Sequence, residues 1–219
     1  MKVLGISGSP INNSNTDRAV LAVLEATGVA DTEFLKLSDY RLDPCRACLG
    51  CANTNRCVLD DDGNLLAGKV RDAAALVVGG FTPYSSLDAR TVTFLERLYP
   101  LRHRKGLMSG KPGAAVITTC VPEADHPMLP PAGDMGVNAI RFYMMEEGME
   151  FLGAVKISGN VPCMKCGRGD TCKTSGVKML YGADATTESV GIHVLEDQLD
   201  IFEQARALGR EIGAKLKAD

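Results

Sequence analysis

Four cysteines with metal-ligand spacing lie within thirteen residues: Cys45, Cys48, Cys51 and Cys57, arranged as C-x2-C-x2-C-x5-C. In a chain without a secretion signal, such crowding indicates metal binding or redox chemistry rather than structural disulfides. Four thiolates can complete the coordination of a [4Fe–4S] cluster, with one thiolate on each iron. A zinc site is the rival hypothesis, although such sites usually consist of two well-separated C-x2-C pairs. A redox disulfide, or thiols that bind nothing, are further alternatives.

A second group of cysteines repeats part of this spacing. Cys163, Cys166 and Cys172 are arranged as C-x2-C-x5-C, like the last three cysteines of the first group. Cys120 ends a predicted strand at 113–119, and Cys163 follows the next predicted strand along the chain. Neighbouring parallel strands end at the same edge of a sheet, so Cys120 and Cys163 should lie near each other. We therefore hypothesise that these four cysteines hold a second metal centre, either iron–sulfur or zinc. The alternative is a loop with free thiols.

Two polar loops are candidates for binding a cofactor. The segment SGSPINNSNT (7–16) leads into a predicted helix, where backbone N–H groups and hydroxyls form an anion site. It matches neither G-x-G-x-x-G nor a Walker A loop, so a monophosphate such as that of FMN fits it better. The alternative is a turn capped by Ser14 or Asn15. The second loop, GFTPYSSLDA (80–89), could line a flat flavin ring with Thr82, Pro83 and Tyr84.

The candidate cofactor-binding residues are Ser7, Gly8, Ser9, Pro10, Ser14, Asn15, Thr16, Thr82, Pro83, Tyr84, Ser85, Thr118 and Thr119. No catalytic acid–base group stands out. The three histidines, His103, His126 and His193, fall in predicted loops or at the edges of elements, and we expect them to be solvated.

The elements that must position these residues follow from the hydrophobic periodicity. It predicts strands at 2–7, 32–37, 75–80, 113–119 and 150–159, and helices at 15–28, 60–73, 86–101, 134–149 and 194–216. Strands that alternate with helices imply a parallel sheet covered on both faces. The predicted fold is therefore an α/β, flavodoxin-like, doubly wound five-stranded parallel sheet of order 2-1-3-4-5. We expect one domain over 1–219, with a cysteine-cluster insertion at about 43–60 and a second cysteine-bearing loop at about 160–193.

Composition excludes several classes of protein. The 219 residues are 45% hydrophobic and 23% charged, so a core can form without disulfides. A net charge of -3 and the lack of tryptophan argue against a nucleic-acid partner. The segment MKVLGISGSP is not predicted to be a signal peptide, and no apolar run approaches the ~20 residues of a membrane span. We expect a cytoplasmic protein with no membrane partner.

Three motifs in this order resemble the iron–sulfur flavoproteins of the NADPH-dependent FMN reductase group: GISGSP…SNT, the four-cysteine run followed by DDD, and GFTPYSSLDARTVTFLERL. The resemblance covers 1–120 well and the rest in outline. It implies a [4Fe–4S] cluster on the first four cysteines and a homodimer or homotetramer with the flavin at a subunit interface. It implies FMN bound by positions matching Ser7, Ser9, Ser14, Asn15 and Thr16, with Pro83 and Tyr84 near the ring.

The function implied is an electron-transfer oxidoreductase that contains FMN and a [4Fe–4S] cluster. It would relay electrons between a ferredoxin-like one-electron donor and a flavin-reduced acceptor, and NAD(P)H is the other donor considered. One alternative is an NAD(P)H-dependent FMN or quinone reductase without a cluster. Another is a non-enzymatic flavodoxin-like module with structural zinc.

Overall fold

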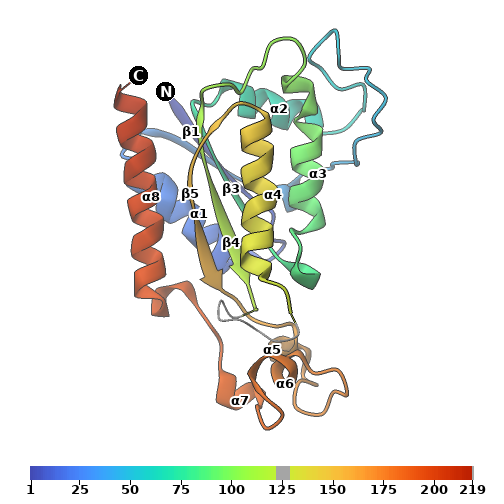
Figure 1. The fold of residues 1–219 in the computed structure, drawn as a ribbon, viewed down its shortest axis with the longest axis vertical. Helices are drawn as coiled ribbons and strands as arrows, with labels where there is room; N and C mark the ends of the chain where they lie inside the picture. The colour runs from blue at the N-terminus through green and yellow to red at the C-terminus, as the bar shows by residue number, and fades with distance from the viewer. Residues whose placement is uncertain (122–128, 219) are drawn as a thin grey trace.

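The computed structural model describes residues 1–121 and 129–218, which form an all-parallel sheet between two layers of helices (Figure 1). The five strands are β1 (Lys2–Ser7), β2 (Asp31–Lys36), β3 (Ala75–Phe81), β4 (Pro112–Thr119) and β5 (Glu150–Ser158). Their order is β2-β1-β3-β4-β5, so the predicted fold and strand order are confirmed. The central strands read as continuous apolar runs because both of their faces are covered.

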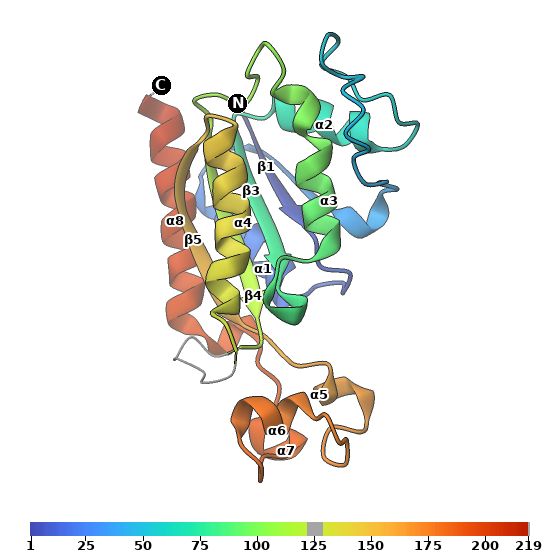
Figure 2. The ribbon, with the colours of Figure 1, turned by 45° about the vertical axis from the view of Figure 1, so that its right-hand side comes forward.

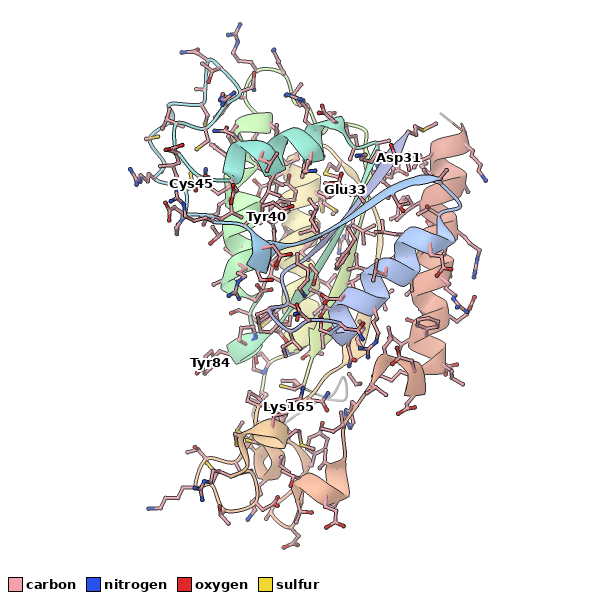
Figure 3. The ribbon with its side chains drawn as sticks, turned by 180° about the vertical axis from the view of Figure 1, so that it is seen from behind. Asp31, Glu33, Tyr40, Cys45, Tyr84 and Lys165 are labelled. Atoms are coloured by element: carbon pink, nitrogen blue, oxygen red, sulfur yellow. The ribbon has the colours of Figure 1, made fainter. Side chains whose placement is uncertain are left out.

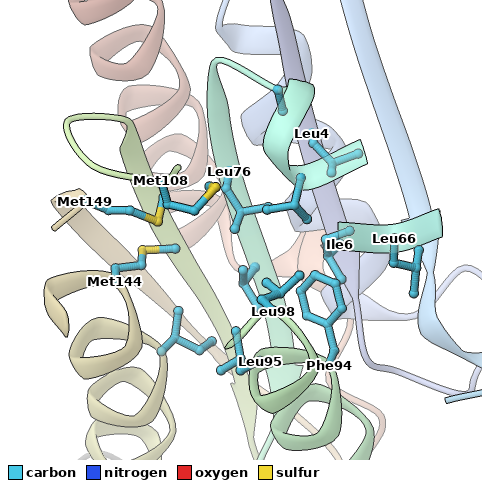
Figure 4. Packing of buried hydrophobic residues seen from close by; sticks show 14 of the residues in the cluster. Leu4, Ile6, Leu66, Leu76, Phe94, Leu95, Leu98, Met108, Met144 and Met149 are labelled. Carbon is cyan, nitrogen blue, oxygen red and sulfur yellow. The ribbon is translucent and has the colours of Figure 1, made fainter. Parts of the chain in front are cut away.

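Each face of the sheet has its own hydrophobic core. Helices α1 (Asn15–Ala26) and α8 (Leu199–Ala218) cover one face, and α2 (Gly63–Asp72), α3 (Ala89–Arg97) and α4 (Ala132–Glu146) cover the other (Figures 1 and 2). Figure 4 shows Ile6 and Leu76 of the sheet in the same cluster as Phe94 and Met144 of the helices. Phe94 has no exposed surface, and its truncation to Ala would cost about 3–5 kcal/mol.

Three helices begin later than the periodicity predicts, and α3 is one of them, since it begins at Ala89 rather than at 86. Helix α2 begins at Gly63 rather than at 60, so Asp60 and Asp61 precede it and no acidic residue lies in its first turn. Helix α8 begins at Leu199 rather than at 194. The residue before it, Gln198, has its side chain bonded to the backbone of Ser158 and Val194, which holds the chain in a turn.

The two cysteine-bearing segments lie at different ends of the molecule. The segment 43–60 has no helix or strand and projects beside α3, whereas 160–193 forms a small lobe beyond the carboxyl ends of the strands (Figures 1 and 2). The lobe holds three short helices, α5 (Cys163–Cys166), α6 (Gly176–Tyr181) and α7 (Thr187–Val190), where the sequence predicts a loop. Reciprocal hydrogen bonds of 2.8 Å between Asn160 and the backbone of His193 close its base.

Among the described residues, no helix has the length and apolar character that a bilayer crossing requires.

Candidate functional site

Three loops that carry the predicted cofactor residues meet at the carboxyl edge of the sheet. The loop between β1 and α1 (8–14), called the β1 loop below, joins the end of β3 through the hydrogen bond from Gly8 N to Gly79 O, 2.9 Å long. The loop between β3 and α3 (82–88), called the β3 loop below, joins β4 through the hydrogen bond from Thr82 N to Thr118 O, 3.2 Å long. The hydroxyls of Thr16 and Thr118 lie 2.7 Å apart. Because parallel strands end together, residues far apart in sequence form one polar surface here.

The start of α1 combines a helix cap with free backbone donors. Ser14 is the N-cap and forms a capping box with Asp17, so the predicted capped turn is confirmed. The cap uses the amides of Ser14 and Asp17, and Arg18 N donates to Ser14 O. The amides of Asn15 and Thr16 have no acceptor within a helix. The capped turn and the anion site are therefore compatible.

The serines of this loop support its shape. Ser7 Oγ donates to Asp17 Oδ1 over 2.6 Å, and Ser9 Oγ accepts a bond of 3.3 Å from Ile11 N. Lys36 at the end of β2 lies 2.6 Å from Asp17 Oδ2 and donates to Ile11 O over 2.9 Å. The buried carboxylate is thus neutralised beneath the loop. Sequence reasoning missed Lys36, because nothing in its own strand marks it.

Gly8 is required by packing within the protein. A Cβ atom at this position would lie 2.0 Å from Thr91 Oγ1 and 2.9 Å from Asp88 Oδ1. Both residues are buried, and Asp88 caps α3 while accepting bonds from Thr91 N and Phe81 N. Burial raises the pKa of Asp88. The β1 loop and the start of α3 therefore touch with no room for a side chain.

Asn15 binds another part of the chain with its side chain. Its Nδ2 donates to His193 O over 3.0 Å, and its Oδ1 accepts from Leu195 N over 3.2 Å. The adjacent pair of Arg18 and Glu196, 2.7 Å apart, strengthens the same junction. The side-chain amide of Asn15 thus anchors the segment that leads to α8, which leaves its backbone amide for a ligand.

The β3 loop carries strained and unsatisfied groups. Tyr84 lies in the left-handed region (φ 51°, ψ 37°) with a fully exposed side chain, and the following Ser85 has φ 60°. Two adjacent non-glycine residues in this region cost on the order of 1–3 kcal/mol each, and such strain clusters at functional sites. Thr82 is buried, and its hydroxyl has no hydrogen-bond partner among the described residues. Pro83 begins the 3-10 turn η2 (Pro83–Ser85).

The remaining predicted residues of this edge have simple positions. Pro10 is exposed in the β1 loop. Thr119 is buried at the end of β4, where its hydroxyl accepts from Val121 N over 3.2 Å and its carbonyl accepts from Gly159 N over 2.7 Å.

The first group of cysteines surrounds one cavity. Cys45, Cys48, Cys51 and Cys57 all line a space of about 340 Å³, which Arg97 also lines from the end of α3. Within 1–121 and 129–218, no three His, Cys, Asp or Glu side chains are placed to hold a single metal ion. Burial raises the pKa of the Cys51 thiol. The four cysteines thus line one open cavity, and no three of their side chains converge on a single metal position.

Sequence reasoning did not assign three residues at this cavity to a site: Arg97, which lines it, and Asp61 and Asn64, which hydrogen-bond to the lining residues Arg97 and Cys57. Arg97 and Asp61 form a buried ion pair, and Asn64 bonds both backbone groups of Cys57. For Asp61 and Asn64, the signal available in the sequence is the run DDDGN at 60–64, two residues after the last cysteine of the group.

The second group of cysteines begins at the edge predicted for it. Cys120 follows β4, Cys163 follows the loop after β5, and these strands are neighbours. Cys163 Sγ accepts from Gly176 N over 3.3 Å, and a hydrogen bond from Thr174 lowers the pKa of Cys172. Burial raises the pKa of Cys120. The second metal centre, which includes Cys166, stays a prediction.

Two histidines are packed rather than solvated. The rings of His103 and His193 lie edge-on to Tyr99 and Tyr181, at centroid distances of 4.8 and 6.2 Å. His126 lies outside the described residues.

The two candidate sites lie at opposite ends of α3. Asp88, next to the β1 loop, caps the first turn of α3. Arg97, the last residue of α3, lines the cysteine cavity. A helix of nine residues is about 13 Å long. Figure 3 shows Tyr84 and Lys165 at one end of the molecule and Cys45 well away from them. Changes at one site should therefore leave the other intact.

Comparisons with known proteins agree with this geometry. The family model for NADPH-dependent FMN reductase matches residues 1–126. An iron–sulfur flavoprotein of Methanocaldococcus jannaschii is 34% identical over 104 residues, which are 47% of this chain and 54% of that protein. One of Methanosarcina thermophila is 30% identical over 118 residues, 53% of this chain and 62% of that protein. The chain thus matches little more than half the length of these curated relatives.

The solved structures show the same fold. A flavodoxin from the domain Archaea aligns with a TM-score of 0.53 and 16% identity, covering 99% of both chains. The sheet order, the polar loop at the start of α1 and the family match over more than half of the chain lead to one conclusion. The chain belongs to the NADPH-dependent FMN reductase family, and it resembles the iron–sulfur flavoproteins within that group.

Proposed function

We propose that the chain is an electron-transfer oxidoreductase with FMN at the 7–16 loop and a [4Fe–4S] cluster on Cys45, Cys48, Cys51 and Cys57. The observation that carries this proposal is the cavity that all four cysteines line. The similarity to two proteins named iron–sulfur flavoproteins supports it.

The shape of the cysteine site suits a cluster better than zinc. A tetrahedral zinc ion needs four sulfur atoms about 2.3 Å from one point. The described residues contain no such group, and the four cysteines instead line a cavity of about 340 Å³. A cubane has a volume of its own and takes one thiolate on each iron. The donor set and the cavity therefore fit a [4Fe–4S] cluster.

The carboxyl edge of the sheet suits a flavin phosphate and ring. The amides of Asn15 and Thr16 point out of the positive end of α1, which favours an anion. The unpaired hydroxyl of Thr82 offers a polar contact, and the exposed ring of Tyr84 offers an aromatic face. These groups lie in the two loops that flank the switch point between β1 and β3, where ligands of such sheets bind.

When bound, a flavin exchanges one or two electrons and a cluster exchanges one, so the two cofactors supply a relay between one-electron and two-electron partners. The chain itself contributes position and charge. Lys36 neutralises Asp17 beneath the phosphate loop, and Arg97 places a positive charge beside Cys57. We propose a ferredoxin-like protein or NAD(P)H as the donor, a homodimer or homotetramer, and a cytoplasmic location.

An NAD(P)H-dependent FMN reductase without a cluster is the second candidate. The observation in its favour is the family match, which covers 1–126 under the description NADPH-dependent FMN reductase.

Anaerobic purification followed by a visible spectrum with flavin, iron and sulfide assays tests both candidates. Flavin bands above a broad absorbance, with about four irons per chain, support the proposal. Flavin bands without iron favour the second candidate. A colourless protein with zinc contradicts both and favours the structural module.

A further inference from the structure

A buried ion pair stands between the cysteine cavity and the core. The side chains of Arg97 and Asp61 are 1% and 0% exposed. Arg97 Nη2 donates to Asp61 Oδ1 over 2.8 Å, and Arg97 Nη1 donates to Oδ2 of the same carboxylate. Such a bidentate ion pair fixes the guanidinium and the carboxylate in one relative geometry. Gly63 is required beside it, because a Cβ there would lie 2.3 Å from Arg97 Nη2.

This pair holds the start of the cysteine segment (43–60), and Asn64 holds Cys57 towards its end. At the start of the segment, Arg97 Nη1 donates to Asp43 O over 2.7 Å and Asp61 Oδ2 accepts from Asp43 N over 2.9 Å. At its end, Asn64 Oδ1 accepts from Cys57 N and Asn64 Nδ2 donates to Cys57 O, both at 2.9 Å. Cys57 is thus held against α2 and α3, whereas Cys45 and Cys48 are exposed.

The same arginine contacts a candidate ligand directly. Arg97 Nη2 lies 3.4 Å from Cys57 Sγ, within hydrogen-bond range for sulfur. Hydrogen bonds and nearby charges at ligand sulfur atoms help to set the potential of iron–sulfur centres. Reduction adds a negative charge to such a centre, so a cation at this position stabilises the reduced form.

We propose that Arg97 is a positioning residue of the cysteine site. Its fork with Asp61 anchors the start of the cysteine segment and holds the guanidinium against the ligand Cys57, and its N–H group on the Cys57 sulfur raises the reduction potential of the iron–sulfur centre bound there. This inference rests on the proposed function.

The test compares a double variant that removes both charges of the pair with single variants. One single variant changes the balance of charge, and the other keeps the charge of Arg97 but loses its fork geometry. Removing one partner of a buried pair leaves an uncompensated buried charge and strongly destabilises the fold, so Arg97→Gln is combined with Asp61→Asn. Asp61→Asn alone leaves the arginine charge unbalanced, and Arg97→Lys keeps the charge but loses the fork. Each protein is reconstituted anaerobically with iron and sulfide. Iron per chain, iron loss to a chelator and the midpoint potential by spectroscopic titration are then measured.

We expect the potential to be highest in Asp61→Asn, intermediate in the wild type and lowest in the double variant. Arg97→Lys should keep a potential near that of the wild type and lose iron to the chelator faster. Two exposed charges serve as matched controls. Arg102→Gln removes one positive charge, as Arg97→Gln does, and Asp72→Asn removes one negative charge, as Asp61→Asn does. Among the described residues, neither side chain has a hydrogen bond or ion pair with a cysteine. Both should leave the potential and the rate of iron loss unchanged.

The outcomes separate this inference from the proposed function. Wild-type protein that takes up no iron overturns the proposed cluster and the role of Arg97 together. Full iron with one common potential in the wild type, Asp61→Asn and the double variant overturns only the role of Arg97. Far-ultraviolet circular dichroism and flavin content report folding, and the single variants still decide if the double variant does not fold.

Discussion

Replacing Gly8 by alanine tests how the two halves of the proposed flavin site are joined. The added Cβ would lie 2.0 Å from Thr91 Oγ1, so that contact must open by about 1 Å even to reach 3.0 Å. Thr91 cannot yield freely, because it is fully buried and its hydroxyl donates to Asp88 Oδ2 over 2.7 Å. The backbone of Gly8 is not left-handed, so the cost is steric rather than conformational.

The size of the effect follows from two contributions. Overpacking of a filled site costs about 1–3 kcal/mol. Weakening the hydrogen bond from Thr91 to a buried carboxylate adds about 1–2 kcal/mol. We therefore expect Gly8→Ala to lower the free energy of unfolding by about 2–4 kcal/mol. The β1 loop should shift away from α3, and the variant should purify with little flavin.

A double-mutant cycle with Thr91→Ala is the decisive assay. That substitution removes the hydroxyl that lies closest to the new Cβ, so Gly8→Ala should cost at least about 1 kcal/mol less in its background. Urea unfolding of the flavin-free proteins measures the energies, and flavin released per chain measures binding. We expect flavin retention to recover in the double variant. Gly68→Ala, with open space around the new Cβ, is the matched control and should stabilise α2 by up to about 1 kcal/mol.

Additive costs in the cycle would refute the packing argument. A double variant that recovers stability but still lacks flavin would show instead that the phosphate itself needs the close approach at Gly8.

Three further predictions address the other groups. Cys51→Ala should abolish iron binding and leave flavin per chain unchanged, since the sites lie at opposite ends of α3; loss of both contradicts this. Burial raises the pKa of Glu147 from 4.5 to about 6, so stability is full below about pH 4.5 and falls by about 2 kcal/mol as the pH rises through 6. Glu147→Gln should remove this loss in urea titrations between about pH 4 and pH 8, and an unchanged pH profile refutes it. Cys172→Ala should lower the metal content if the second centre exists, and an unchanged iron and zinc stoichiometry ends that hypothesis.

Much of the scaffold could be predicted because its signals are local. The strand bounds differ by at most one residue from those the periodicity predicts, since each strand is an apolar run between turn residues. The strand order followed from the alternation of strands and helices. Ser14 was identifiable as a cap, because its hydroxyl acts on the backbone of its own turn. These features depend on residues that are neighbours along the chain.

The roles of individual side chains at both sites were decided only by the tertiary structure. Arg97 falls inside the helix predicted at 86–101, with nothing to mark its partner, yet it binds the backbone of Asp43, 54 positions away. Asn15 was assigned to a phosphate, and its side-chain amide binds His193 O, 178 positions away. Gly8 was predicted as a cofactor-binding residue, and only the fold shows that a Cβ there would also meet Thr91 and Asp88 at the start of α3. Periodicity records which face of an element is buried, whereas the partner of a buried polar group depends on which elements the fold brings within about 3 Å of it.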